Sequence, residues 1–211
     1  MVHYKLHYFD LYGRAEPARM MFHMAGQEFE DRRYSFEDWP AIKKAETPST
    51  FLFGQGPVLE VDGKKIAQSG AISRFVGNTF GFAGKDFLEL AQIDMFVDRL
   101  ADFFQQIAEW YIVRVGYKEG DVEELRKTLL DEHKKGFLGD LERQLKANGT
   151  GFLVGDKVSF GDLVLLNNFD VFTRLSPTYL DGYDEVKSYE KRLRELPKLK
   201  EYLESRPPSL Q

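Results

Sequence analysis

The sequence of 211 residues contains no cysteine. Disulfide scaffolds, cysteine-ligated zinc or iron–sulfur sites and a cysteine nucleophile are therefore excluded. Any thiol chemistry would need a thiol that arrives on a ligand. Histidine is scarce as well: there are four, with no HExxH motif and no two on one predicted helical face. We therefore expect no metal site.

The chain also lacks long apolar and long basic runs. No apolar stretch approaches the roughly 20 residues that a membrane-spanning helix needs, and the N-terminus has no secretory-type apolar segment. The formal charge is −5, from 29 Lys+Arg and 34 Asp+Glu. Phosphate binding needs clustered cations, so this charge disfavours nucleic acid and anionic membranes as partners. The expectation is a cytoplasmic globular protein, with no nucleic acid and no membrane among its partners.

The first 80 residues mix strand and helix patterns. Apolar residues alternate over residues 2–9, which predicts a strand, and residues 14–25 predict a helix that ends at Gly26. Further expected elements are a strand near 28–33, a hairpin of 58–61 and 64–67 around Asp62-Gly63, and a helix over 69–78. This order combines a parallel crossover with an antiparallel hairpin.

From residue 86 onward the apolar spacing is helical throughout. The expected helices cover residues 86–115, 121–147, 159–175, 185–195 and 198–205. Ser159 and Asp162 form a capping-box pattern at the start of the third of these helices. The chain therefore divides into an α+β domain, residues 1–80, and an all-α domain, residues 86–211, joined by a linker at 79–84.

Four places in the first domain could bind a ligand. Tyr8 ends the first strand just before Gly13-Arg14 opens a helix, where unpaired backbone N–H groups favour an anion. By spacing alone, a core tyrosine on the face of Tyr4 and Leu6 is the favoured interpretation. Gln68-Ser69 precedes another helix start, and Ser69 could serve only as a cap. Gly56-Pro57, with glycine before it, predicts a tight, cis-type turn whose backbone could pair with a peptide ligand, or an ordinary loop. Trp39 and Lys43 would share one helical face.

Together these stretches resemble cytosolic glutathione S-transferases. The matching segments are residues 4–9 with Gly13-Arg14-Ala15-Glu16, 53–60, 68–72 and 155–162. They run in the same order as in the family and cover essentially the whole chain. The likeness is greatest to the sigma class, which includes nematode enzymes and haematopoietic prostaglandin D synthase.

The resemblance implies a thioredoxin-like N-terminal domain, an all-α C-terminal domain and a homodimer. Glutathione would be the co-substrate, no metal would be required, and Tyr8 and Arg14 would be the catalytic residues. Glutathione would contact Tyr8, Arg14, Trp39, Lys43, Gln55, Gly56, Pro57, Gln68, Ser69 and, in the partner subunit's site, Asp102. The hydrophobic substrate would contact Phe9, Gly13, Ile107, Tyr111 and Leu210.

The expected function is conjugation of glutathione to small hydrophobic electrophiles, a detoxification reaction. Three alternatives stay open: a glutathione-dependent prostaglandin D isomerase, a carrier of hydrophobic ligands such as haem, and a crystallin-like structural protein. Two positions depart from the family pattern. Gly56 stands where a branched apolar residue is usual, and Ala101 separates Asp98 and Asp102 where the prostaglandin synthase has a metal-binding acidic cluster.

Overall fold

The computed structural model describes residues 2–209 of the chain. It contains two compact units, Met1–Ala83 together with Arg194–Gln211, and Gly84–Leu193. The first unit contains all four strands, and the second is helical. The expected fold class, α+β followed by all-α, is therefore confirmed.

The sheet of the first unit is mixed and has the order β2-β1-β3-β4. Its strands are β1 (Tyr4–Phe9), β2 (Glu30–Tyr34), β3 (Val58–Val61) and β4 (Lys64–Ala67). Strand β1 pairs parallel to β2 and antiparallel to β3, and β3 pairs antiparallel to β4. At the β3–β4 turn Asp62 and Gly63 both have positive φ, 48° and 81°, as the Asp-Gly hairpin signal requires. The predicted crossover and hairpin are both present.

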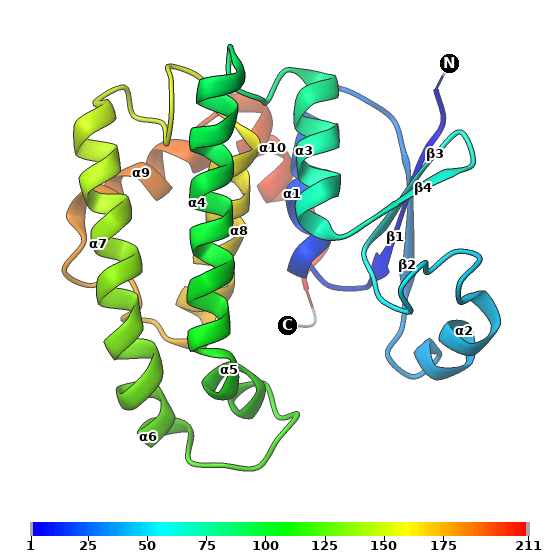
Figure 1. Ribbon diagram of the computed structural model, residues 1–211, viewed down its shortest axis with the longest axis horizontal. Coiled ribbons are helices and arrows are strands. Elements are labelled where there is room, and N and C mark those ends of the chain that lie inside the picture. The colour runs from blue at the N-terminus through cyan, green and yellow to red at the C-terminus, as the bar shows by residue number, and fades with distance from the viewer. Residues whose placement is uncertain (1, 210–211) are drawn as a thin grey trace. The chain divides into compact units, whose positions relative to one another are not determined.

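Helices α1 (Glu16–Ala25) and α3 (Ser69–Phe80) lie on the same face of this sheet (Figure 1). The Tyr4 ring contacts Phe22 of α1 and Phe80 of α3, with ring centroids 5.3 and 5.6 Å apart. Side chains alternate between the two faces of a strand, so Tyr8 is on the face of Tyr4. His7, on the other face, contacts Tyr34 and Phe51.

Two further helices complete the first unit. Helix α2 (Trp39–Glu46) places Trp39 and Lys43 on one helix, as their spacing suggests, and α10 (Pro197–Ser205) packs on α1 (Figure 1). The expected division placed this last helix with the all-α domain, residues 86–211. By its packing, α10 belongs to the first compact unit. The chain thus returns to its first unit after the second one.

The second unit is built around the long helices α4 (Phe87–Gln106), α7 (Asp131–Asn148) and α8 (Phe160–Leu175), which Figure 1 shows side by side. The shorter elements are α5 (Ala108–Arg114), α6 (Val122–Leu125), a π-helical turn at Arg126–Leu130, and α9 (Asp184–Arg194). The expected helix 86–115 breaks at Ile107. Because Ile107 and Trp110 are both fully buried, the apolar pattern continues across the break and does not reveal it.

The capping box at the start of α8 is present as predicted. The Asp162 carboxylate accepts hydrogen bonds from the Ser159 N–H (2.7 Å) and hydroxyl (2.6 Å), and the Ser159 hydroxyl accepts one from the Asp162 N–H. The Leu153 N–H (2.8 Å) and the Tyr189 hydroxyl (2.6 Å) also donate to Asp162. Burial raises the pKa of this carboxyl group above its ordinary value. The motif therefore joins three segments of the second unit.

No helix in the described part of the chain has both the length and the apolar character needed to cross a membrane.

Candidate active site

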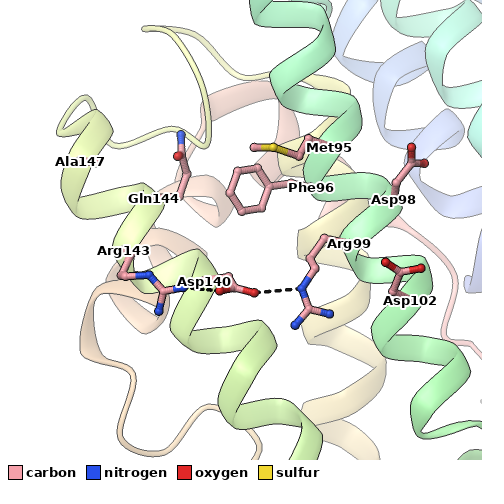
Figure 2. A pocket seen from close by; sticks show the side chains of 9 residues that line it. All are labelled: Met95, Phe96, Asp98, Arg99, Asp102, Asp140, Arg143, Gln144 and Ala147. Carbon is pink, nitrogen blue, oxygen red and sulfur yellow. Dashed lines mark hydrogen bonds and ion pairs between the residues drawn. The ribbon is translucent and has the colours of Figure 1, made fainter.

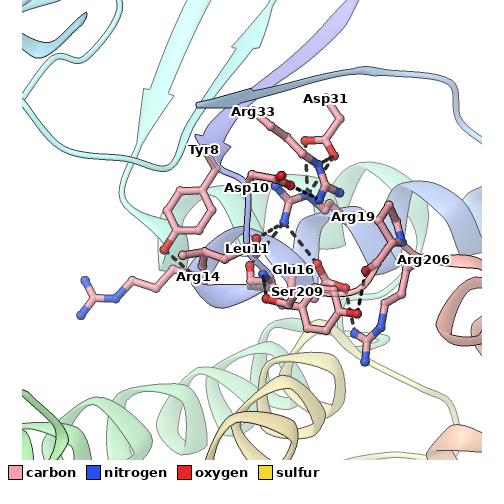
Figure 3. Close-up of polar contacts among 12 residues, drawn as sticks. Tyr8, Asp10, Leu11, Arg14, Glu16, Arg19, Asp31, Arg33, Arg206 and Ser209 are labelled. Carbon is pink, nitrogen blue, oxygen red and sulfur yellow. Dashed lines mark hydrogen bonds and ion pairs between the residues drawn. The ribbon is translucent and has the colours of Figure 1, made fainter. Parts of the chain in front are cut away.

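Tyr8 lies at the carboxyl end of β1, directly before the loop that leads to α1. Its side chain is buried, and its hydroxyl oxygen accepts a hydrogen bond of 3.2 Å from the backbone N–H of Arg14 (Figure 3). The Arg14 side chain is exposed and extends away from this contact. A phenol oxygen that already accepts a hydrogen bond becomes a stronger donor through its own O–H. The geometry thus prepares Tyr8 to donate to an anion.

The loop reaches Tyr8 because position 13 is glycine. Gly13 has a φ of +43°, and a Cβ atom there would lie 2.8 Å from the Tyr8 hydroxyl oxygen and 2.3 Å from Leu11 Cδ1. No real Cβ atom tolerates such distances. From Gly13 a short 3₁₀ turn, Gly13–Ala15, leads directly into α1, where Pro17 is in the first turn. Tyr8, Gly13 and the Arg14 N–H are therefore brought together, as the sequence predicts.

A buried arginine that sequence reasoning missed supports the same loop from the inside. Arg19 of α1 is 1% exposed and donates through Nη1 to the carbonyl oxygens of Leu11 (2.7 Å) and Tyr12 (3.3 Å). It also pairs with Glu16 and with Asp31 of β2 (Figure 3). The signal in the sequence was an ion pair three residues apart on an otherwise apolar helix.

Helix α2 is attached to the sheet by aromatic packing. The half-buried Trp39 ring meets Phe9 and Phe51 edge-on, with centroids 5.0 and 4.8 Å apart. Lys43, one turn later, is exposed, and its Cε would lie 3.1 Å from a Cβ atom on Gly54. Phe9 in turn contacts the Tyr8 ring at 5.4 Å. The aromatic contacts link Trp39 to Tyr8.

The segment before β3 lies against Tyr8. The Gly56-Pro57 peptide is cis, as expected from the sequence, and a Cβ atom on Gly56 would lie 3.2 Å from Cδ2 of Tyr8. Pro57 is buried and Gln55 is exposed. Strand β3 pairs Val58 with His7, so the register of the sheet brings Gly56 beside Tyr8.

The loop that enters α3 carries an unusual backbone conformation. Gln68 has φ 75° and ψ 119°, a region that costs a non-glycine residue free energy and that often marks functional sites. Gln68 is the N-cap and Ser69 is the first helical residue, so the interpretation of Ser69 as the N-cap is wrong. The Gln68 side chain makes no capping hydrogen bond. The N-terminus of α3 thus presents N–H groups that suit an anion.

The remaining expected residues belong to the second unit. Asp98 and Asp102 are exposed along α4, with the exposed Ala101 between them. Tyr111 is half-buried and contacts the Phe104 ring at 5.1 Å. Ile107 is fully buried in the core of the unit. Leu210 lies outside the described residues.

The second unit also has a hollow that the sequence did not indicate. It measures about 660 Å³ and lies between α4 and α7, with Phe96 among its apolar lining residues. Asp140 of α7 pairs there with Arg99 of α4 and with Arg143 (Figure 2). Among residues 2–209, no group of three or more His, Asp or Glu side chains could hold a metal ion.

Comparison with known proteins identifies this architecture. The glutathione S-transferase N-terminal domain model matches residues 4–78, and the C-terminal domain model matches residues 101–206. The chain is 42% identical to glutathione S-transferase 1 of Ascaris suum, over 98% of both chains.

Solved structures agree with the sequence comparison. A hookworm glutathione S-transferase from Necator americanus, described as monomeric, is 43% identical with a TM-score of 0.92, over 99% of this chain and 100% of that one. A prostaglandin synthase D from Nilaparvata lugens is 35% identical with a TM-score of 0.85, over 98% and 99%. With both domain models matched and full-length relatives above 40% identity, the chain belongs to the glutathione S-transferase family.

Proposed function

We propose that this glutathione S-transferase joins the thiol of reduced glutathione to small hydrophobic electrophiles, and that Tyr8 is its catalytic residue. The observation that carries the assignment is the hydrogen bond from the Arg14 N–H to the Tyr8 hydroxyl, in a loop that Gly13 allows to approach. A phenol supplied with this donor can direct its own O–H to the sulfur of glutathione. The reactive thiol then comes from the ligand, as the absence of cysteine requires.

Lowering the pKa of the glutathione thiol accounts for only part of the acceleration of the conjugation reaction. A free thiol with a pKa of about 8.5 is roughly 3% thiolate at pH 7, and lowering that pKa by about 2 raises the fraction to roughly three quarters. The gain of roughly 25-fold is reduced by about 8-fold, because a less basic thiolate is a weaker nucleophile. A net gain of about 3-fold remains from these terms, so positioning of the electrophile must provide most of the acceleration.

Glutathione binding is assigned to groups that suit its charges and its peptide backbone. The N-terminus of α3, at Gln68 and Ser69, suits the γ-glutamyl carboxylate. The backbone of Gly56, before Pro57, suits strand-like pairing with the cysteinyl residue. The exposed Lys43 suits the glycyl carboxylate. Trp39, Gln55 and Arg14 complete the proposed glutathione site, and Phe9 and Tyr111 are proposed to face the electrophile.

Replacement of Tyr8 by phenylalanine tests the catalytic role. A hydrogen bond to a charged group is worth about 1.5–3 kcal/mol, enough to account for a change of about 2 in the thiol pKa. Tyr8→Phe should therefore move thiolate formation to higher pH and lower kcat at pH 7 for a chlorodinitrobenzene electrophile by about 3-fold. The KM for glutathione should change little. Tyr4→Phe is the matched control, because Tyr4 is a buried tyrosine on the same strand and the same face. Unchanged turnover in Tyr8→Phe would remove Tyr8 from the mechanism.

We further propose a cytoplasmic, sigma-class homodimer in which Asp102 contacts glutathione in the partner subunit's site. Support comes from the exposed acidic side chains of α4, Asp98 and Asp102, and from the neighbouring hollow. Because one solved relative is described as monomeric, the mass in solution must be measured. Sedimentation should give twice the chain mass of 24.4 kDa. A monomer that is fully active and has unaltered kinetics in Asp102→Asn would contradict the proposal.

A glutathione-dependent prostaglandin D isomerase is the second candidate. The likeness to the prostaglandin synthase D from Nilaparvata lugens favours it, whereas Ala101 interrupts the acidic pair. Product analysis with a prostaglandin endoperoxide and glutathione distinguishes the two activities. D-type product above the uncatalysed background would establish the isomerase.

A further inference from the structure

The last described residues of the chain pack against the loop that follows Tyr8. The C-terminal tail, residues 202–209, belongs to the same compact unit as this loop. Its contacts reach Glu16 and Tyr12, which flank Gly13 and Arg14 (Figure 3). The Arg14 N–H that bonds Tyr8 therefore lies between two positions held by the tail.

At Glu16 the contact is a buried charge pair. The Glu16 carboxylate is fully buried, and its Oε1 accepts hydrogen bonds from Arg206 (2.8 Å) and from the Tyr202 hydroxyl (2.9 Å). Its Oε2 pairs with Arg19. Burial and the nearby Glu16 charge raise the pKa of Tyr202, so its hydroxyl remains a donor. Both carboxylate oxygens are thus engaged, and removing Arg206 leaves a buried anion with one cation fewer.

At Tyr12 the tail makes three separate contacts. The Arg206 guanidinium lies 4.0 Å above the centre of the Tyr12 ring, within the range of a cation–π interaction. The Tyr12 hydroxyl donates to the Pro207 carbonyl oxygen (2.8 Å), and the Tyr12 N–H donates to the Ser209 hydroxyl (3.2 Å). The ring, the hydroxyl and the backbone of this one loop residue are all held by the tail.

The hydrogen bond that this loop makes to Tyr8 is already long. The bond from the Arg14 N–H to the Tyr8 hydroxyl measures 3.2 Å, at the long end of normal N–H···O hydrogen bonds. The loop is close to Tyr8 at Gly13, where a Cβ atom would lie 2.8 Å from the Tyr8 hydroxyl oxygen. A small outward shift of the loop would therefore weaken the bond.

We propose that the C-terminal tail, through Arg206, positions the loop that supplies the Arg14 N–H to Tyr8. Arg206 is then a positioning residue for the transferase reaction, acting through Glu16 and Tyr12 without touching the substrate. Arg19 holds the loop carbonyls from the inside, and Arg206 holds the flanking side chains from the tail. The inference rests on the proposed catalytic role of Tyr8.

The experiment compares Arg206→Met with Arg206→Lys and with a matched control. Lys198 is on the same helix, α10, and its Nζ donates to the Met24 carbonyl oxygen at the far end of α1 (3.0 Å). Lys198→Met thus removes a contact between the same two helices away from Tyr8. For each full-length variant, kcat, the KM for glutathione and the thiolate absorbance of bound glutathione are measured against pH, with a melting temperature to monitor folding.

Arg206→Met should move thiolate formation to higher pH and should lower kcat, by less than the roughly threefold loss expected for Tyr8→Phe, because Arg206 acts only through that residue. The KM for glutathione should stay within about twofold. Arg206→Lys should recover part of kcat, because it keeps the charge opposite Glu16, and Lys198→Met should keep the wild-type pH profile. A wild-type profile and kcat in Arg206→Met would overturn the proposal, as would an equal change in Lys198→Met.

Two further variants keep the test decisive. If Arg206→Met does not fold, Tyr12→Phe removes the hydroxyl that donates to Pro207 and should shift the profile in the same direction. No shift would overturn the proposal. Tyr8→Phe separates the two levels of the argument. If Tyr8→Phe leaves turnover unchanged, the proposed function fails. If it lowers turnover while Arg206→Met and Tyr12→Phe do not, only the role of the tail fails.

Discussion

Gly56 lies against the ring of Tyr8, since a Cβ atom built on Gly56 would stand 3.2 Å from Cδ2 and 3.7 Å from Cε2 of that ring. Gly13 approaches the same ring from its hydroxyl end, where a Cβ atom would stand 3.0 Å from Cε1 and 2.8 Å from the oxygen. Two glycines therefore define the position of the tyrosine. The family resemblance leads one to expect a branched residue in place of Gly56, so this close approach of a glycine to the ring is a departure of this chain from the family pattern.

A side chain at position 56 should displace Tyr8. In Gly56→Ala the ring or the backbone must give by a few tenths of an ångström, and Gly56→Val adds a branched side chain to the same contact. Because small misplacements of catalytic groups are costly, we expect kcat to fall about threefold for alanine and more for valine. Steady-state kinetics with a chlorodinitrobenzene check this. Equal kcat in the two variants and the wild type would show that the ring is not confined by Gly56.

Replacement of Gly13 should affect both folding and turnover. A Cβ atom there would overlap Leu11 and the Tyr8 hydroxyl, and alanine would also be strained at the φ of +43°. We expect Gly13→Ala to lose about 2 kcal/mol or more of unfolding free energy and to lose turnover. Denaturant titration and kinetics measure the two effects.

Gly26→Ala is the control for Gly13→Ala. Gly26 ends α1 with a φ of +66°, but a Cβ atom there would meet nothing within 4 Å. Alanine at this position should cost about 1 kcal/mol from backbone strain and should leave kcat unchanged. If Gly26→Ala and Gly13→Ala lower stability equally, the loss in Gly13→Ala comes from backbone strain and not from overlap with Leu11 and Tyr8.

Acid should destabilise the first unit through His7. Burial lowers the pKa of His7 below its ordinary 6.5, and the nearby Lys5 lowers it further against the opposing charges of Glu60, Glu46 and Glu30. Between the folded pKa and 6.5 the unfolded chain binds more protons than the folded one. The stabilising contribution is thus present above pH 6.5 and is lost as pH falls through the folded pKa.

The measurement is the free energy of unfolding against pH in wild type and His7→Gln. The wild type should lose stability from pH 7 downward more steeply than the variant, in which this side chain does not titrate. His3→Gln, at an exposed position near the start of the same strand, is the control and should follow the wild type. Parallel curves for wild type and His7→Gln would exclude His7 as the source.

Loss of the buried capping carboxylate of Asp162 should lower the free energy of unfolding more than loss of an exposed capping carboxylate. Asp162→Asn replaces an acceptor of four hydrogen bonds with an amide whose NH₂ faces donors, so we expect a loss of about 3 kcal/mol or more. Asp121 caps α6 at an exposed position through two backbone N–H groups, and Asp121→Ala should cost about 1 kcal/mol. Denaturant titration measures both losses of unfolding free energy. Equal losses in the two variants would show that burial of the cap does not increase its contribution to stability.

The sequence predicted those elements whose signals are local. The β3–β4 turn follows from the conformations that Asp62 and Gly63 adopt, and α8 follows from its capping box. For helix α2 the sequence indicated only a shared helical face of Trp39 and Lys43, without bounds, because none of its residues is fully buried and no apolar stripe marks the helix. The helix is anchored by its first residue, Trp39, which packs on Phe51, a residue that follows the helix in the sequence.

In the candidate site, too, the sequence predicted contacts between nearby residues but not contacts between distant ones. Tyr8, Gly13 and Arg14 were found because a strand end and a helix start lie within a few residues of each other. The contact of Arg206 with Glu16 spans 190 positions, and in the sequence Arg206-Pro207-Pro208 indicates only the end of a helix. No local pattern connects a residue at the end of the chain to a loop at its beginning.

The return of α10 to the first unit has a consequence for biosynthesis. Residues 84–193 leave the ribosome as one uninterrupted stretch and can complete their own core during translation. The first unit has its sheet early but must wait for residues 194–209 before Glu16 and Tyr12 gain their tail contacts. Tyr8, the proposed catalytic residue, is therefore synthesised well before the tail that completes its surroundings.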